Sequence, residues 1–221
     1  LETVTIGINV ETIPDCMFAD CESLSSVVFK ENGKVKMIGR MAFFGCSSLE
    51  EFVFPANVES NFTLGASAFS GCSSLESITL PDNVKTIPDN AFLDCVSLET
   101  VLMRSDAAGT VGASAFAGCV KLKNVTLSDG ITQIKQKAFL NCAALEQITL
   151  PQSLTKLGNG STTSNAGYGN VFENCVSLKE ITLPEGVSII DVATFKNCES
   201  LAKVTVSGAL TLIREDAFEG C

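Results

Sequence analysis

The stretch DNAFLDCVSLETVLM, residues 89–103, places a phenylalanine, a cysteine and a leucine three residues apart and then continues as an alternating apolar segment. The Phe-x-x-Cys part occurs nine times between Phe18 and Cys221, and a leucine follows three residues later in every copy but the last. Successive leucines are most often 23 residues apart, as from Leu75 to Leu98. A period of this length is typical of leucine-rich solenoids.

A strand is predicted after each leucine, because apolar and polar residues alternate there. Examples are LESITL (75–80), LKNVTL (122–127), LEQITL (145–150) and LKEITL (178–183). Successive side chains of a strand point to opposite faces, so Ile78 and Leu80 are expected inside and Ser77 and Thr79 outside. A proline often follows, at Pro55, Pro81, Pro151 and Pro184. Proline lacks the amide that a ladder needs, so the strand is expected to end there.

The return path carries a second apolar pattern. Pairs such as Val84 and Ile87, or Ile131 and Ile134, predict a second extended segment, and Pro88 with Asp89 favours a short helical turn at the following Ala-Phe. We therefore predict a single leucine-rich repeat solenoid over residues 1–221, with about nine repeats and truncated at both ends. It would be a right-handed coil with one short parallel strand per repeat on the concave face and extended or helical turns on the return side.

Nine of the ten cysteines occupy the repeated position. We interpret them as buried free thiols that donate weakly to backbone carbonyls, because cysteine is small and often buried. Disulfides are the alternative, but stacked parallel side chains keep Cβ atoms wider apart than a disulfide requires. Zinc is disfavoured, since the chain has neither histidine nor a CxxC pair. Cys16 lies outside the column and is either an exposed thiol or a local partner of Cys21.

The full pattern, with Phe92, Cys95, Leu98 and the Leu-Pro of residues 80–81 as examples, resembles the BspA-like, or treponemal-type, leucine-rich repeats. The resemblance covers the whole chain. It implies a secreted or cell-wall-attached bacterial protein that adheres to host extracellular proteins or to other cells. It transfers no catalytic residue, because the motif is structural. An extracellular or cell-surface location is expected from this resemblance alone.

A binding surface is predicted on the outward side of the strands, where two columns of side chains merge into one face. Threonine dominates the second column, which is also what an exposed strand prefers without any ligand. Val28, Val53 and Leu102 interrupt it, and exposed apolar residues there are the stronger indication of binding. The candidate residues are Val28, Glu51, Val53, Thr79, Thr100, Leu102, Thr126, Gln147, Thr149, Tyr168, Glu180, Thr182, Lys203 and Thr205.

Two further features bear on a partner. Glu50, Glu76 and Glu99 stack like charges on adjacent repeats, which would attract a basic partner or a divalent cation, although a solvated acidic face is the commoner meaning. The longest insertion, LGNGSTTSNAGYGNVF at 157–172, is expected to be a surface loop and carries the only tyrosine, Tyr168.

Composition excludes several functions. No histidine is present to serve as a general base, and no phosphate loop or dinucleotide fingerprint occurs, so neither catalysis nor a cofactor is expected. The net charge of −10 disfavours nucleic acid and anionic membranes, and no apolar run is long enough to insert into a membrane. The expected partner is an extracellular protein or a glycan. A passive stalk or glycan-binding spacer is the alternative, and the oligomeric state stays open.

Overall fold

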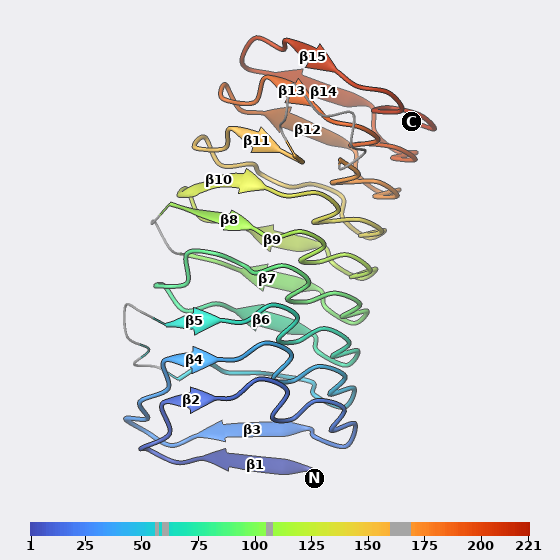
Figure 1. The fold of residues 1–221 in the computed structure, drawn as a ribbon. Helices are drawn as coiled ribbons and strands as arrows, with labels where there is room; N and C mark the ends of the chain where they lie inside the picture. Colours follow the sequence, from blue (N-terminus) through green and yellow to red (C-terminus); the bar gives the residue numbers. More distant parts are fainter. Residues whose placement is uncertain (56–57, 59–61, 105–107, 160–168) are drawn as a thin grey trace.

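The computed structural model describes residues 1–55, 58, 62–104, 108–159 and 169–221, which stack as successive coils of one solenoid (Figure 1). Strands lie along two sides of the stack. The row that follows the leucines, here called the leucine-side sheet, comprises β1 (Thr3–Ile6), β3 (Ser26–Phe29), β6 (Ser77–Thr79), β7 (Thr100–Leu102), β9 (Asn124–Thr126), β12 (Glu180–Leu183) and β14 (Lys203–Val206). The return side carries β2 (Thr12–Ile13), β4 (Met37–Ile38), β5 (Thr63–Leu64), β8 (Gly109–Val111), β10 (Ile131–Ile134), β11 (Lys156–Leu157), β13 (Ile189–Ile190) and β15 (Leu212–Ile213).

Every strand pair among the described residues is parallel and aligns equivalent positions of neighbouring repeats. In the β6–β7 pair, for example, Ile78 lies opposite Val101, and Thr79 lies opposite Leu102. The alternation predicted from the sequence is confirmed, because Ile78 and Leu80 are buried while Ser77 and Thr79 are exposed. The predicted second extended segment is confirmed as well, since Ile131 and Ile134 are the first and last residues of β10.

A column of phenylalanines fills the interior. Nine rings from Phe18 to Phe218 stack with centroids 5.3–5.7 Å apart and nearly parallel planes. The cysteine column runs beside them, and each thiol from Cys46 onward donates a hydrogen bond to the carbonyl of the phenylalanine in the preceding coil, as Cys119 Sγ does to Phe92 O at 3.1 Å. All ten cysteines are free, which confirms the prediction of free thiols.

The predicted helical turn at Ala-Phe is wrong: the described residues contain no helix, and consecutive tight turns take its place. The physical reason lies in two left-handed residues per repeat. One is two residues before the phenylalanine, as at Lys137 (φ 58°), and the other immediately precedes the cysteine, as at Asn141 (φ 62°). A positive φ breaks the right-handed progression that a helix needs. Cys16, the cysteine outside the column, occupies the first of these positions with φ 57° and is exposed.

The leucine-side sheet is interrupted twice. It divides into β1–β3, β6–β7–β9 and β12–β14, and residues 51–54 and 147–150 between these groups form no strand. The strand predicted for LEQITL at 145–150 is therefore wrong. Residues 51–54 retain only one isolated bridge, from Glu51 to Ser77.

The first interruption coincides with an unusual inward side chain, that of Phe52. Other repeats have valine or isoleucine at this inward position. The Phe52 ring instead packs edge-on against the rings of Phe43 and Phe69, with centroids 5.1 and 4.7 Å apart. Because the interior is close-packed, a larger ring at this position favours a shift of its own backbone out of the ladder.

Candidate binding surface

Most of the predicted surface residues lie where the sequence placed them, on the outward side of the leucine-side sheet. Thr100 and Leu102 are half-buried. Tyr168 lies outside the described residues. The exposed members are Val28, Glu51, Val53, Thr79, Thr126, Gln147, Thr149, Glu180, Thr182, Lys203 and Thr205. These residues are spread along the whole array, so exposure alone defines no site.

The structure brings one subset together around the first interruption. Val28 is 46% exposed and Val53 is 69% exposed, which is unusual for valine on a sheet. Both line an open groove of about 590 Å³ between β3 and residues 51–55. Exposed aliphatic side chains inside a groove favour contact with an apolar group of a partner.

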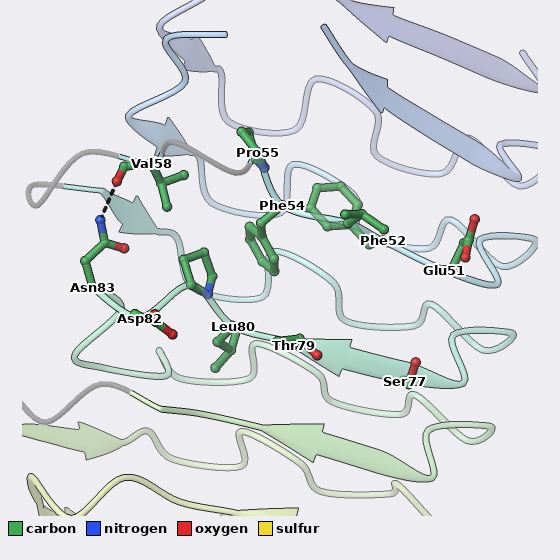
Figure 2. Close-up of a pocket in the computed structure, with 12 residues that line it drawn as sticks. Glu51, Phe52, Phe54, Pro55, Val58, Ser77, Thr79, Leu80, Asp82 and Asn83 are labelled. Atoms are coloured by element: carbon green, nitrogen blue, oxygen red, sulfur yellow. Dashed lines mark hydrogen bonds between the residues drawn. The ribbon is translucent and has the colours of Figure 1, made fainter. Parts of the chain in front are cut away.

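A second groove, of about 610 Å³, lies on the other side of the same segment (Figure 2). Glu51, Val53 and Pro55 form one wall, and β6 with the turn at Asp82 forms the other. At the far end of this groove the Asn83 side chain donates a 2.8 Å hydrogen bond to the carbonyl of Val58. Residues 51–55 thus stand as a ridge between two grooves, and we call this whole region the split-sheet surface.

The backbone of the ridge is part of the site. In the described part of the chain, the amides and carbonyls of Val53 and Phe54 make no hydrogen bond. The equivalent residues of an intact coil are paired, as Met103 is when its amide donates to the carbonyl of Thr126 at 3.0 Å. Backbone polar groups need partners, so those of the ridge are available to water or to a ligand.

The electrostatics of the split-sheet surface are acidic. Glu51 and Asp82 line one groove, and Glu31 and Lys30 line the other. The neighbouring Glu50 and Glu76 are also exposed. Among the described residues no cation lies within ion-pair distance of these carboxylates.

Further along the same row the charges do pair. Lys123 contacts Glu99 at 3.3 Å, and Lys179 contacts Glu146 at 2.6 Å. The hydrogen bond from Lys179 lowers the pKa of the Glu146 carboxyl. A smaller groove of about 350 Å³ is lined by this second pair together with Gln147, Glu180 and Lys203. Within this row, the carboxylates without an ion-pair partner among the described residues are therefore those of the earlier repeats, including Glu50 and Glu76 beside the split-sheet surface.

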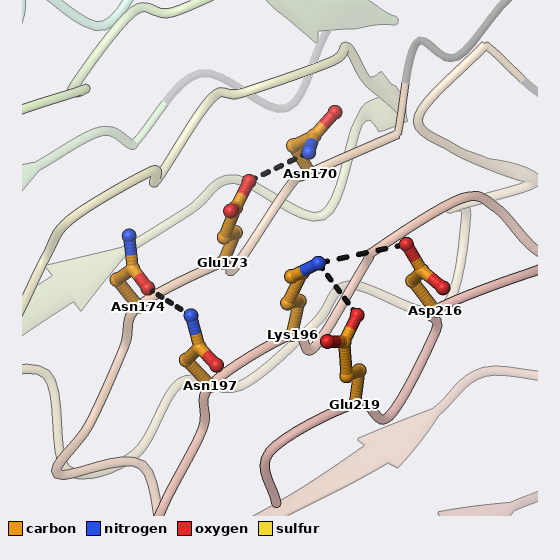
Figure 3. A network of polar contacts seen from close by, with 7 residues as sticks. All are labelled: Asn170, Glu173, Asn174, Lys196, Asn197, Asp216 and Glu219. Carbon is orange, nitrogen blue, oxygen red and sulfur yellow. Dashed lines mark hydrogen bonds and ion pairs between the residues drawn. The ribbon is translucent and has the colours of Figure 1, made fainter.

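A polar network lies on the turns and not on this face (Figure 3). The side chain of Asn174 donates a hydrogen bond to Asn141 at 2.7 Å and accepts one from Asn197 at 2.8 Å. These three asparagines form a ladder, and each occupies the left-handed position directly before the cysteine of its own repeat. Lys196 forms an ion pair with Glu219. These contacts join adjacent turns, so the network supports the solenoid. This asparagine ladder was not predicted, although the Asn-Cys pairs repeated at residues 141–142, 174–175 and 197–198 indicate it.

The reactivity of the buried thiols follows from their surroundings. Burial raises the pKa of the column thiols from Cys46 to Cys198, to about 12 for Cys46, which keeps them protonated. Within the described ranges no group of three or more histidine, cysteine or acidic residues is arranged to hold a metal ion. The same ranges contain no helix long and apolar enough to cross a membrane.

Parallel coils with a phenylalanine column, a cysteine column and a strand after each leucine define a leucine-rich repeat solenoid. The chain belongs to the BspA type leucine-rich repeat family, whose model of six repeat copies matches residues 1–106, 59–168 and 167–221. No curated protein shows a significant match.

Solved bacterial structures share the fold. A leucine-rich repeat protein from Bacteroides ovatus is 29% identical with a TM-score of 0.65, and the match covers 100% of this chain and 64% of that one. One from Eubacterium ventriosum is 28% identical with a TM-score of 0.63, covering 75% and 45%. The leucine-rich repeat protein of T. pallidum is 20% identical with a TM-score of 0.51, covering 99% and 76%, and shows similarity of fold. The chain thus spans less than two thirds of the first two proteins.

Proposed function

We propose that the chain is a non-catalytic module that binds an extracellular protein through the split-sheet surface. The observation that carries this proposal is the pair of grooves that flank exposed Val28 and Val53 on an otherwise threonine-rich face. Exposing a valine side chain to water is unfavourable, and a passive spacer has no need of such exposure. In a binding face, a partner that covers the valines stabilises the complex by removing their surface from water.

Location at the bacterial surface is part of the same proposal. It is supported by membership of the BspA type family and by the description of a structural neighbour from Faecalibacterium prausnitzii as a leucine rich cell surface protein. An adhesive role follows if the partner belongs to a host or to a neighbouring cell.

Binding of the purified chain to immobilised extracellular-matrix proteins and to a glycan array tests the proposal. The key variant is Val28→Lys/Val53→Lys, which replaces both exposed valines with charges. Its matched control is Thr182→Lys/Thr205→Lys, because these threonines occupy the same column on the paired strands β12 and β14.

We expect saturable binding to at least one protein, weakened about tenfold or more by the valine pair and unchanged by the threonine pair. Thermal unfolding of each variant verifies that the coils remain folded. Binding to glycans alone would favour the glycan-binding spacer, and the absence of all binding would favour the stalk.

A further inference from the structure

We infer that the occupant of the split-sheet surface is an extended, basic polypeptide segment with aliphatic side chains at its centre. This inference rests on the proposed protein-binding function and specifies the chemistry of the partner. Three features of the ridge and its grooves point to it, namely the free backbone groups, the exposed valines and the unpaired carboxylates.

The backbone groups of the ridge that lack hydrogen bonds favour a partner in extended conformation. Val53 and Phe54 have amides and carbonyls without hydrogen bonds to described residues, whereas Leu102 and Met103, the equivalent residues of an intact coil, are held in or next to a parallel ladder. A peptide in strand conformation presents donors and acceptors at the matching spacing, which is how strand addition to a free edge achieves affinity. Glycans carry hydroxyl groups but lack this regular repeat of amide donors and carbonyl acceptors.

The side chains of the grooves call for aliphatic contacts. Val28 and Val53 line the same groove from adjacent coils, and Pro55 lines it as well. In a bound strand every second side chain would point toward these residues, because successive side chains alternate between faces. Valine or isoleucine at those positions would bury both valines.

The charge of the surface selects a basic segment. Glu51 and Asp82 line the larger groove, Glu50 and Glu76 flank it, and no described cation neutralises them. Among the described residues that line either groove, Lys30 is the single basic one. Lysine or arginine at the ends of the bound segment would pair with these carboxylates, so affinity should fall as salt concentration rises.

The test uses a fluorescein-labelled peptide, acetyl-KKVTVTVKK-amide, and fluorescence anisotropy with the whole chain. Three peptide controls each remove one feature. EEVTVTVEE reverses the charge, KKSTSTSKK removes the aliphatic side chains, and a version of the first peptide with alternate backbone amides N-methylated removes hydrogen-bond donors. We expect saturable binding of the first peptide and about tenfold weaker binding of each control.

Variants of the chain locate the site. Val53→Thr restores the side chain usual in its column, and Glu51→Gln removes one groove carboxylate. We expect Val53→Thr to weaken peptide binding about fivefold and Glu51→Gln about threefold. The matched controls are Thr182→Val and Glu180→Gln, which make the reciprocal and identical changes on β12, and both should leave affinity unchanged.

Equal binding of the N-methylated peptide, or equal binding by Val53→Thr and the native chain, would overturn the inference. So would failure of all four peptides to bind. If the chain then still bound an intact protein in a manner sensitive to Val28→Lys/Val53→Lys, the inference would fail while the proposed function stood.

Discussion

At the scale of single residues, the cysteine column acts through its burial and its weak hydrogen bonds. Each thiol from Cys46 to Cys198 lies in the dry interior and donates to a phenylalanine carbonyl of the preceding coil, as Cys142 does to Phe116 at 3.3 Å. Burial disfavours the charged thiolate, and it is the largest cause of the raised pKa values of Cys95, Cys142 and Cys175. The column is therefore suited to packing, and its thiols are protected from reaction.

Stability should fall in alkaline solution because of these thiols. An unfolded cysteine ionises near its ordinary pKa of 9.0, while burial raises the pKa of folded Cys46 to about 12. The unfolded state then binds fewer protons than the folded state above about pH 9, so the free energy of unfolding decreases as pH rises toward 12. Each fully buried thiol contributes a slope of about 1.4 kcal/mol per pH unit in this window.

Denaturant unfolding of Cys119→Ala between about pH 9 and about pH 11 measures the effect of one thiol. The variant should be less stable than the native chain at neutral pH. Its free energy of unfolding should also fall less steeply with pH, by about 1.4 kcal/mol per pH unit, which is the contribution of one buried thiol. Cys16→Ala, which removes an exposed thiol, is the control and should keep the native slope. Identical slopes for Cys119→Ala and the native chain would contradict the account.

At the scale of elements, regular alternation was sufficient to predict most strands of the leucine-side sheet, because valine, isoleucine and leucine at the inward positions fit the coil spacing. The predicted helical turn failed, since residues as different as Met41, Lys137 and Ala193 adopt positive φ at equivalent positions. The side chains of these residues give no indication of a positive φ. Tertiary hydrogen bonds to the next coil impose it, such as that from the amide of Met41 to the carbonyl of Ala66.

The asparagine ladder illustrates how turns are joined. Asn174 keeps a positive φ of 61°, which asparagine and glycine tolerate, while its side chain bonds to both neighbours. Asn174→Gly preserves the backbone and removes both side-chain bonds, so we expect a loss of about 1–2 kcal/mol of unfolding free energy. Chemical denaturation measures this loss. Asp94 occupies the equivalent left-handed position and makes no side-chain hydrogen bond to the described residues, so Asp94→Gly should change stability by less than half as much.

At the scale of the whole molecule, the outward face of the leucine-side sheet was predictable from the sequence. The position of the two grooves, where the ladder of that sheet is interrupted, was not. The exposed valines at 28 and 53 were visible in the threonine column, and their exposure is as expected. The grooves were not foreseeable from that column, because they depend on Phe52 packing against rings of neighbouring coils. The second interruption, at residues 147–150, has ordinary inward residues in Ile148 and Leu150, and nothing in their identity indicates it.

The central claim is that the ladder is open at the ridge and that this opening creates the binding surface. Amide hydrogen exchange resolved by residue tests it most directly, because exchange reports the loss of individual backbone hydrogen bonds. Leu102 and Met103 are the matched references, since they occupy the positions of Val53 and Phe54 in the paired strand β7 and directly after it. We expect the amides of Val53 and Phe54 to exchange at least about a hundredfold faster than those of Leu102 and Met103. Equal protection of the two pairs would show an intact ladder and would rule out an opening at the ridge.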